Sequence, residues 1–282
     1  MSKMLPAILL IVFLLSSEIF AAEIKSPAEL FNKMQKAYKA INSYSYTNEQ
    51  GEYDTFNKEY QKETAKNYSD YNSKYGDGKS SKVSDKPEYK RGNYEVKFYK
   101  PYSIRMKIIS SDYTPSVLNN AEFIYRPGSD PKNFIVKILG LGFIPLEFQR
   151  DVQKENTGDF LVMNWTVDLL QLDYFFKNGT SAILKEKNKI DNRDAYILEF
   201  KFAKDVKPSA PGYNPGDIPS QVKFKIDYTL GSLERVKYSS VKYWVDKKDL
   251  IIIKREEFIG GKSHSTRIFK NIILNSVKKS DI

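Results

Sequence analysis

The chain has 282 residues, of which 41% are hydrophobic and 28% charged, and it contains no cysteine and a single histidine, His264. The hydrophobic share is too high for a disordered chain, and the length allows one large domain or two small ones with a sizeable core. The lack of cysteine excludes thiolate zinc sites, iron–sulfur clusters, thiol nucleophiles and disulfides. One histidine makes an imidazole-rich metal site or a Ser-His-Asp triad hard to build. Composition therefore disfavours catalysis.

Residues 1–21 have the three-part layout of a secretory signal peptide. Lys3 precedes an apolar run from 5 to 15, and the small residues Ala21 and Ala22 follow it. The run is shorter than the roughly 20 residues that span a bilayer, so an uncleaved anchor is the minor alternative. We expect cleavage near Ala21, export to the periplasm and a soluble mature protein without a lipid anchor, since no cysteine follows the run.

Two segments have the periodicity of helices. The first starts at Ser26, has Glu29 placed for a capping box, and gathers its apolar residues on one face as far as position 41. The second runs from about 159 to 176 and stops at Asn178. Its apolar stripe is so wide that we expect this helix to be buried on most sides.

Alternating apolar and polar residues predict roughly ten antiparallel strands, in a sheet with one buried and one wet face. The candidate strands are 43–53, 94–99, 103–109, 121–126, 133–138, 182–190, 195–202, 221–228, 233–245, 250–258 and 263–274. The segment 138–148 is apolar, broken by glycines, and fits neither a helix nor a regular strand. Residues 205–220 form a proline-rich loop, and 57–88 form a polar insertion with only two aliphatic residues. Strands with segregated helices indicate an α+β fold.

Several short segments resemble the periplasmic lipoprotein-carrier superfamily, whose members have the LolA-like fold. The segments are the first helix, Lys100-Pro101 with the strand after it, 243–249, Gly260-Gly261 and 269–272. Within this resemblance, residues 121–137 are similar to an uncharacterised bacterial family, domain of unknown function 1571. The resemblance covers most of the mature chain but not the insertion at 57–88, and the sequence alone does not identify the arginine that locks the helical lid in the carriers.

The resemblance implies a single domain over residues 22–282. Its sheet would be large, curved and antiparallel, an unclosed half-barrel of about ten strands with two or three helices on its concave face. The half-barrel would enclose an apolar cavity.

Two apolar segments, 138–148 and 160–176, are the candidates for a lid and a cavity lining. The candidate lining residues are Leu141, Phe143, Val162, Trp165, Leu169, Leu172 and Phe176. The helices could equally fill the concave side with side chains, and the sequence leaves both possibilities open. An open cavity would bind an acyl chain through apolar burial, at about 0.8 kcal/mol per methylene.

The titratable residues that catalysis would need are better explained as structural. We expect His264 to be exposed at a hairpin end, and Asp246 and Asp249 to be turn residues. Adjacent Glu256 and Glu257 should point to opposite faces of one strand. We therefore predict no enzyme activity, no catalytic residue, no metal and no cofactor.

The sequence thus predicts a non-enzymatic, exported, monomeric protein that binds a lipid or an acylated lipoprotein. The formal charge of +10 allows attraction to an anionic membrane surface. Basic and acidic residues are interleaved along the whole chain, which does not favour nucleic acid as a partner. The alternative is a structural or interaction module of the cell envelope that binds a protein partner.

Overall fold

The computed structural model describes residues 24–53, 89–113, 116–128, 133–139, 145–150, 164–207 and 237–282, with the single positions 218, 222 and 226. The predicted signal peptide, the polar insertion at 57–88, and the candidate residues Leu141, Phe143 and Val162 lie outside these described residues. Neither the length nor the hydropathy that crossing a bilayer requires is found in any helix of the described ranges.

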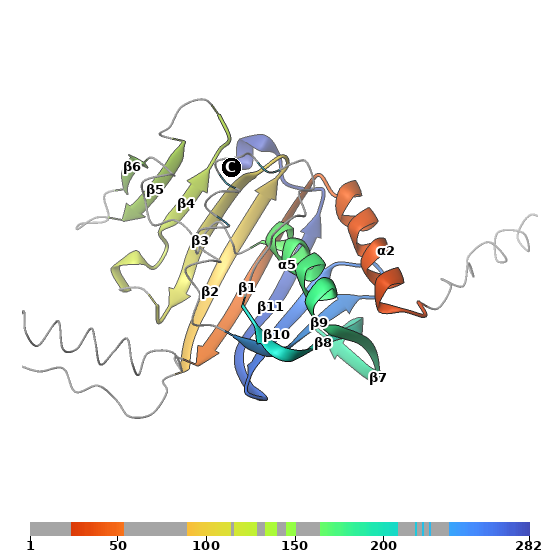
Figure 1. Cartoon of the computed structure of the whole chain (residues 1–282). Coiled ribbons are helices and arrows are strands. Elements are labelled where there is room, and N and C mark those ends of the chain that lie inside the picture. The colour runs from red at the N-terminus through yellow and green to blue at the C-terminus, as the bar shows by residue number, and fades with distance from the viewer. Residues whose placement is uncertain are drawn as a thin grey trace, which may run out of the picture.

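The described strands form one antiparallel sheet of 11 strands in the order β6-β5-β4-β3-β2-β1-β11-β10-β9-β8-β7 (Figure 1). They are β1 (Ser43–Tyr53), β2 (Tyr89–Tyr99), β3 (Ser103–Ser111), β4 (Glu122–Tyr125), β5 (Phe134–Leu139), β6 (Pro145–Arg150), β7 (Thr180–Ile190), β8 (Arg193–Val206), β9 (Tyr238–Asp246), β10 (Ile252–Ile259) and β11 (Lys262–Leu274). The sheet does not close, because β6 and β7 are its two edges.

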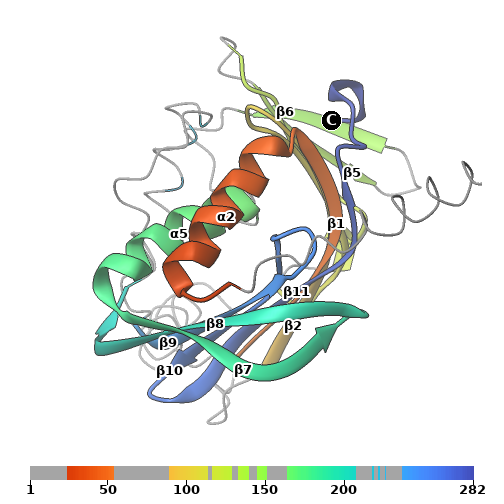
Figure 2. The same ribbon diagram turned by 90° about the vertical axis from the view of Figure 1, so that its right-hand side faces the viewer.

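Two α-helices of the described ranges lie in the concavity of this curved sheet (Figure 2). The helices are α2 (Pro27–Ala40) and α5 (Trp165–Asn178), and two short 3-10 helices are η1 (Ser116–Leu118) and η2 (Lys279–Asp281). The prediction of an open, curved antiparallel sheet with helices on its concave face, an α+β fold, is confirmed. Both α-helices start where a polar side chain accepts hydrogen bonds from the first turn, Ser26 for α2 and Asn164 for α5. Glu29 accepts from the backbone N–H of Lys25 rather than closing a capping box on Ser26.

Tight turns follow β7 and β10. Asp191 and Asn192 have φ angles of 50° and 61°, and Gly260 and Gly261 have 54° and 75°. Two consecutive residues with positive φ make a turn whose twist matches that of the flanking strands. Asn, Asp and Gly are the residues that adopt this backbone most readily.

Two predictions of local structure are wrong. Val222 and Ile226, described within the predicted strand 221–228, are helical and fully buried. Their spacing of four suits one side of a helical turn, but the apolar residues at every second position suit a strand equally well. Within 138–148, Pro145 begins strand β6, which pairs with β5. Proline is tolerated there because it is the first residue of an edge strand.

Candidate functional site between helix α5 and the concave face

Helix α5 is buried on nearly all sides. Every residue from Trp165 to Leu172 is buried, including the polar side chains of Asp168 and Gln171. A helix at the surface of a sheet keeps one polar face in water, whereas this one is inserted into the half-barrel (Figure 2). The prediction of a helix buried on most sides is confirmed.

The concave face beneath the start of α5 is aromatic. We call Tyr44, Tyr46, Phe98 and Phe269, from β1, β2 and β11, the aromatic floor. The ring of Trp165 on α5 lies 4.5 Å from that of Tyr44, 5.2 Å from that of Tyr46 and 6.0 Å from that of Phe269, measured between centroids. Aromatic pairs at such distances contribute about 0.5–1.5 kcal/mol each beyond the area they bury.

An apolar row continues from the aromatic floor to the edge of the sheet. The strand registers place one side chain per strand in this row, from β1 to β6: Tyr46, Val96, Met106, Phe123, Val136 and Phe148. The row is buried on β1, β2 and β3, and its last member, Phe148, is 38% exposed. Five steps of about 4.8 Å between strands give it a length of about 24 Å. The concave face therefore holds a long apolar track that ends at solvent.

Beside the aromatic floor lies a buried charge cluster, which consists of Asp168, Gln171, Arg255, Glu257 and Arg267. Arg255 Nη1 donates to Asp168 Oδ1 at 2.7 Å and to Gln171 Oε1, and Arg255 Nη2 lies 2.5 Å from Glu257 Oε1. Arg267 Nη1 lies 3.9 Å from Asp168 Oδ1. Because Asp168 and Gln171 belong to α5 and the other three to β10 and β11, the cluster fastens the helix to the sheet.

Arg255 and Glu257 hold each other in the ionised form. Burial lowers the pKa of Arg255, but Glu257, Tyr243 and Asp168 outweigh it and raise that pKa well above its ordinary value. Burial likewise raises the pKa of Glu257, but Arg255 and a hydrogen bond from Ser265 bring it below its ordinary value. Removing one partner of such a buried pair leaves an uncompensated charge, at a cost of about 3–5 kcal/mol.

Several buried polar atoms at this interface have no hydrogen-bond partner among the described residues. They are Tyr44 Oη, Asn48 Nδ2 and Oδ1, Asp168 Oδ2, Arg255 Nε, Trp165 Nε1 and Tyr243 Oη. Asn48 is completely buried, and its cross-strand partners Phe269 and Tyr94 place it on the concave face. Each unpaired buried group costs about 1–3 kcal/mol. The packing of α5 thus leaves hydrogen-bonding capacity that a rearrangement or a ligand can satisfy.

His264 is buried, so the prediction of an exposed histidine is wrong. Glu257 pairs with Ser265 and Phe258 with Ser263, which makes His264 the extra residue of a β-bulge in β11. Its Nε2 lies 3.3 Å from Glu52 Oε1. The pattern of apolar residues gives no sign of this bulge.

The acidic residues considered for catalysis have the structural roles expected of them. Asp246 Oδ1 accepts hydrogen bonds of 2.6 and 2.7 Å from two backbone N–H groups of the turn. Arg193 pairs with both Asp246 and Asp249. Glu257 faces the buried charge cluster, whereas Glu256 faces the other side of β10 and pairs with Lys254.

Four of the predicted lining residues are described, and all belong to α5. Trp165, Leu169 and Leu172 are buried in the core, and Phe176 packs against Phe31 of α2 with 4.9 Å between ring centroids. The four side chains are spread along α5, with Trp165 at its start and Phe176 near its end. That they line a ligand cavity stays a prediction.

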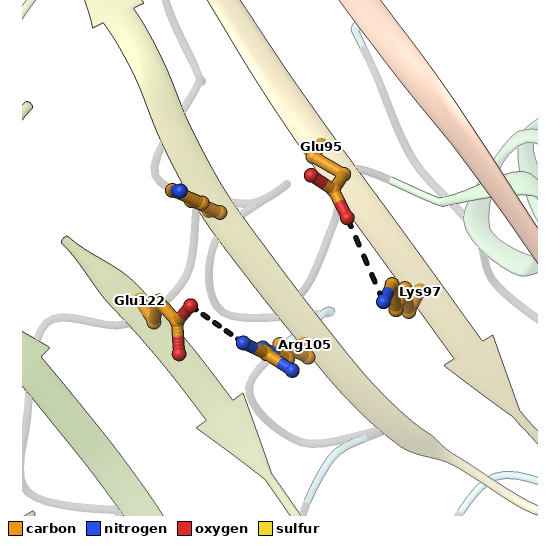
Figure 3. Close-up of a pocket in the computed structure, with 5 residues that line it drawn as sticks. Glu95, Lys97, Arg105 and Glu122 are labelled. Atoms are coloured by element: carbon orange, nitrogen blue, oxygen red, sulfur yellow. Dashed lines mark hydrogen bonds and ion pairs between the residues drawn. The ribbon is translucent and has the colours of Figure 1, made fainter. Parts of the chain in front are cut away.

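A shallow pocket of about 110 Å³ lies on the convex face over β2, β3 and β4 (Figure 3). Its lining pairs opposite charges: Arg105 with Glu122 at 2.5 Å, and Lys97 with Glu95 at 3.7 Å, beside Lys107. Partly exposed pairs of this kind contribute about 0–1 kcal/mol and belong to the wet face of the sheet. We therefore do not assign a binding site there.

No family model matches the chain, and no curated protein matches it. The similarity of residues 121–137 to domain of unknown function 1571 therefore stays a prediction. Among solved structures, the chain is similar to a LolA superfamily protein from Nitrosomonas europaea, with 11% identity, a TM-score of 0.30, and 91% of this chain and 97% of that chain covered.

Two further solved structures show similarity. A DUF1329 family protein from Desulfovibrio piger has 10% identity and a TM-score of 0.30, with 89% of this chain and 93% of that chain covered. The MucA/MucB complex of Pseudomonas aeruginosa has 8% identity and a TM-score of 0.41, with 90% of this chain covered. The chain spans 59% of the length of the matched chain in that complex.

Proposed function

We propose that the protein binds an acyl chain, of a lipid or of an acylated lipoprotein, between helix α5 and the concave face, and that it does so without catalysing a reaction. We place this activity in the periplasm, after removal of the predicted leader at 1–21. One observation carries the proposal. A helix buried on nearly all sides covers an apolar face and is fastened to it through the buried charge cluster.

Displacing α5 would uncover the aromatic floor and the apolar row. An acyl chain lying along them would replace the contacts that the helix gives up. At about 0.8 kcal/mol per buried methylene, ten methylenes supply about 8 kcal/mol, which can offset the free energy needed to move the helix. Binding along such a surface requires apolar length rather than a specific polar contact.

Arg255 fits the role of the arginine that, by the resemblance, locks the helical lid. It is buried on β10 and holds Asp168 and Gln171 of α5 in one place. These contacts of Arg255 determine how much of the protein is in the closed arrangement, in which α5 covers the concave face. Weakening them should raise the apparent affinity for an acyl ligand, because less of the binding free energy is used to open the protein.

The test measures binding of phenylnaphthylamine, an uncharged apolar fluorophore, to the purified mature protein. Arg255→Leu should raise the apparent affinity about tenfold, which corresponds to about 1.4 kcal/mol removed from the closed state. Gln171→Leu removes only the hydrogen bond that Arg255 donates to Gln171 Oε1, and should act in the same direction with a smaller effect. It keeps the test valid if Arg255→Leu does not fold.

Arg193→Leu is the matched control, because Arg193 pairs with two carboxylates of a turn and not with α5. It should leave probe binding unchanged. A wild-type protein that binds neither the probe nor any extractable lipid would refute the proposal. Equal affinity in wild type and both lock variants would refute the role of Arg255.

A second candidate function, recognition of a protein partner, is favoured by strand β6. It is an edge of the described sheet, and its Leu146 and Phe148 are 41% and 38% exposed. Exposed edges can pair with a strand of another chain. Leu146→Glu should then abolish recovery of a partner from envelope extracts, whereas Ile273→Glu, at an exposed position of β11, should not.

A further inference from the structure

The concave face has a polar part next to the apolar row, on strands β1, β11, β10 and β9. Gln50, Arg267, Arg255 and Tyr243 stand side by side in one row across these strands. Asn48 precedes Gln50 by two positions on β1 and therefore faces the same side of the sheet. Helix α5 brings Asp168 and Gln171 down onto this part of the sheet.

This polar part contains unpaired donors and unpaired acceptors together. Asn48 contributes an amide NH₂ group with two N–H donors and an acceptor oxygen, Arg255 Nε is a donor, Asp168 Oδ2 is an acceptor, and Tyr243 Oη is both. Their number at one place is unusual, because the large majority of buried polar groups in proteins are hydrogen-bonded. A partner for all of them must itself both donate and accept.

The charges of the cluster indicate that this partner is neutral. Arg255 and Arg267 carry two positive charges, and Asp168 and Glu257 carry two negative ones. Glu52, which lies across β11 from Glu257 and contacts His264, adds a further carboxylate. A free carboxylate or phosphate would bring negative charge into a buried site whose cations are already paired, which is costly.

The polar part and the apolar row meet on strand β1. Tyr46, the first member of the row, precedes Asn48 by two positions and shares its face. A ligand with its head at Asn48 can therefore lay its chain along the row toward Phe148 on β6. The exposed end of the row gives a long chain an exit to solvent.

We infer that Asn48, together with the buried charge cluster, binds the uncharged glycerol-ester head of an acyl ligand, with the ester and hydroxyl oxygens on the unpaired groups. This inference rests on the proposed function and names the class of ligand. Glycerol esters supply hydroxyl donors and carbonyl acceptors without a net charge. Mono- and diacylglycerols carry that head, whereas the diacylglyceryl group of a lipoprotein has no free glycerol hydroxyl and supplies acceptors only.

The experiment measures displacement of phenylnaphthylamine by three ligands with chains of equal length: monopalmitoylglycerol, palmitate and hexadecane. The wild type should prefer monopalmitoylglycerol over both others. Asn48→Leu keeps the size of the side chain but removes the amide, so the affinity for monopalmitoylglycerol should fall about tenfold. The affinity for hexadecane should not change. Asn48→Ala serves the same purpose if leucine does not fit.

Asn93→Leu is the matched control. Asn93 also has an unpaired amide oxygen, but it lies next to Gly92 and Tyr94 on the other face of β2. It should leave all three affinities unchanged. If Asn48→Leu changes the affinities for monopalmitoylglycerol and hexadecane equally, or changes neither, the head site is overturned while the proposed function stands. Failure of all three ligands to displace the probe would overturn both.

Discussion

Arg255 is the side chain on which the closed arrangement depends most directly. It is buried and links two residues of α5 to Glu257 on its own strand. A buried, paired arginine of this kind seldom adds much stability compared with an apolar side chain, but removing one partner is costly. Its position beneath α5 therefore fits a role in holding that helix in place better than a role in stabilising the fold.

Asn48 leads to a prediction about stability. Its amide is buried with both polar atoms unpaired, so an apolar side chain of similar size removes a desolvation cost. Asn48→Leu should raise the free energy of unfolding by about 1 kcal/mol, measured by urea denaturation. A substantially destabilised variant would mean that the amide has a structural partner in the folded protein.

Glu257 leads to a prediction about pH. Its folded-state pKa is lowered from 4.5, since Arg255 and Ser265 outweigh the effect of burial. The carboxylate therefore contributes stability that is present above pH 4.5 and is lost as the pH falls through the lowered pKa. Urea unfolding from neutral pH to about pH 3 should show a smaller acid loss for Glu257→Gln than for wild type. An identical acid loss would contradict the assignment.

At this scale the sequence predicted side chains whose roles are local. Asp246 and Asp249 were identifiable as turn residues because they flank two lysines between strands. Arg255 and Asp168 were not, because their partners are 87 positions apart in the chain. The one signal available was the alternation of Ile253, Arg255 and Glu257 on one face of β10. It identifies Arg255 and Glu257 as buried only once that face is known to be the buried one.

Helix α5 is the element that the proposed function requires to move. Its first turn is held by Asn164, which accepts hydrogen bonds from Thr166 N and Val167 N and donates one of 2.8 Å to Tyr102 Oη. The start of α2 and the stop of α5 followed from the sequence, since caps and apolar periodicity are local properties, whereas the cap of α5 at Asn164 was not predicted. Strand β6 could not be predicted in this way. It forms through pairing with β5, and the glycines in its apolar segment hide the pattern of a strand.

The cap of α5 gives a prediction for the element. Asn164→Ala should cost about 1–2 kcal/mol and speed amide hydrogen exchange in α5 without affecting β1 and β11. Ser26→Ala, which removes the cap of α2, is the matched control and should speed exchange in α2 only. Equal exchange of α5 in wild type and Asn164→Ala would show that packing alone fixes the helix.

For the whole molecule, the period-two pattern was sufficient to predict an antiparallel sheet, and the resemblance supplied its curvature and openness. What neither provided is the division of the concave face into an aromatic floor, an apolar row and a buried charge cluster. That division depends on the register of six or more strands, and a shift of one residue turns every side chain to the other face. The bulge at His264 is one such shift, and the pattern of apolar and polar residues does not predict it.

The central claim is that an acyl chain lies beneath α5 on the aromatic floor. The chain has two tryptophans, so Trp244→Phe leaves Trp165, which packs against that floor, as the sole tryptophan, and its fluorescence is excited at a wavelength that tyrosine does not absorb. Titration of this variant with mono(dibromostearoyl)glycerol should quench the Trp165 fluorescence in step with displacement of phenylnaphthylamine. Displacement of the probe without any quenching of Trp165 would contradict the account.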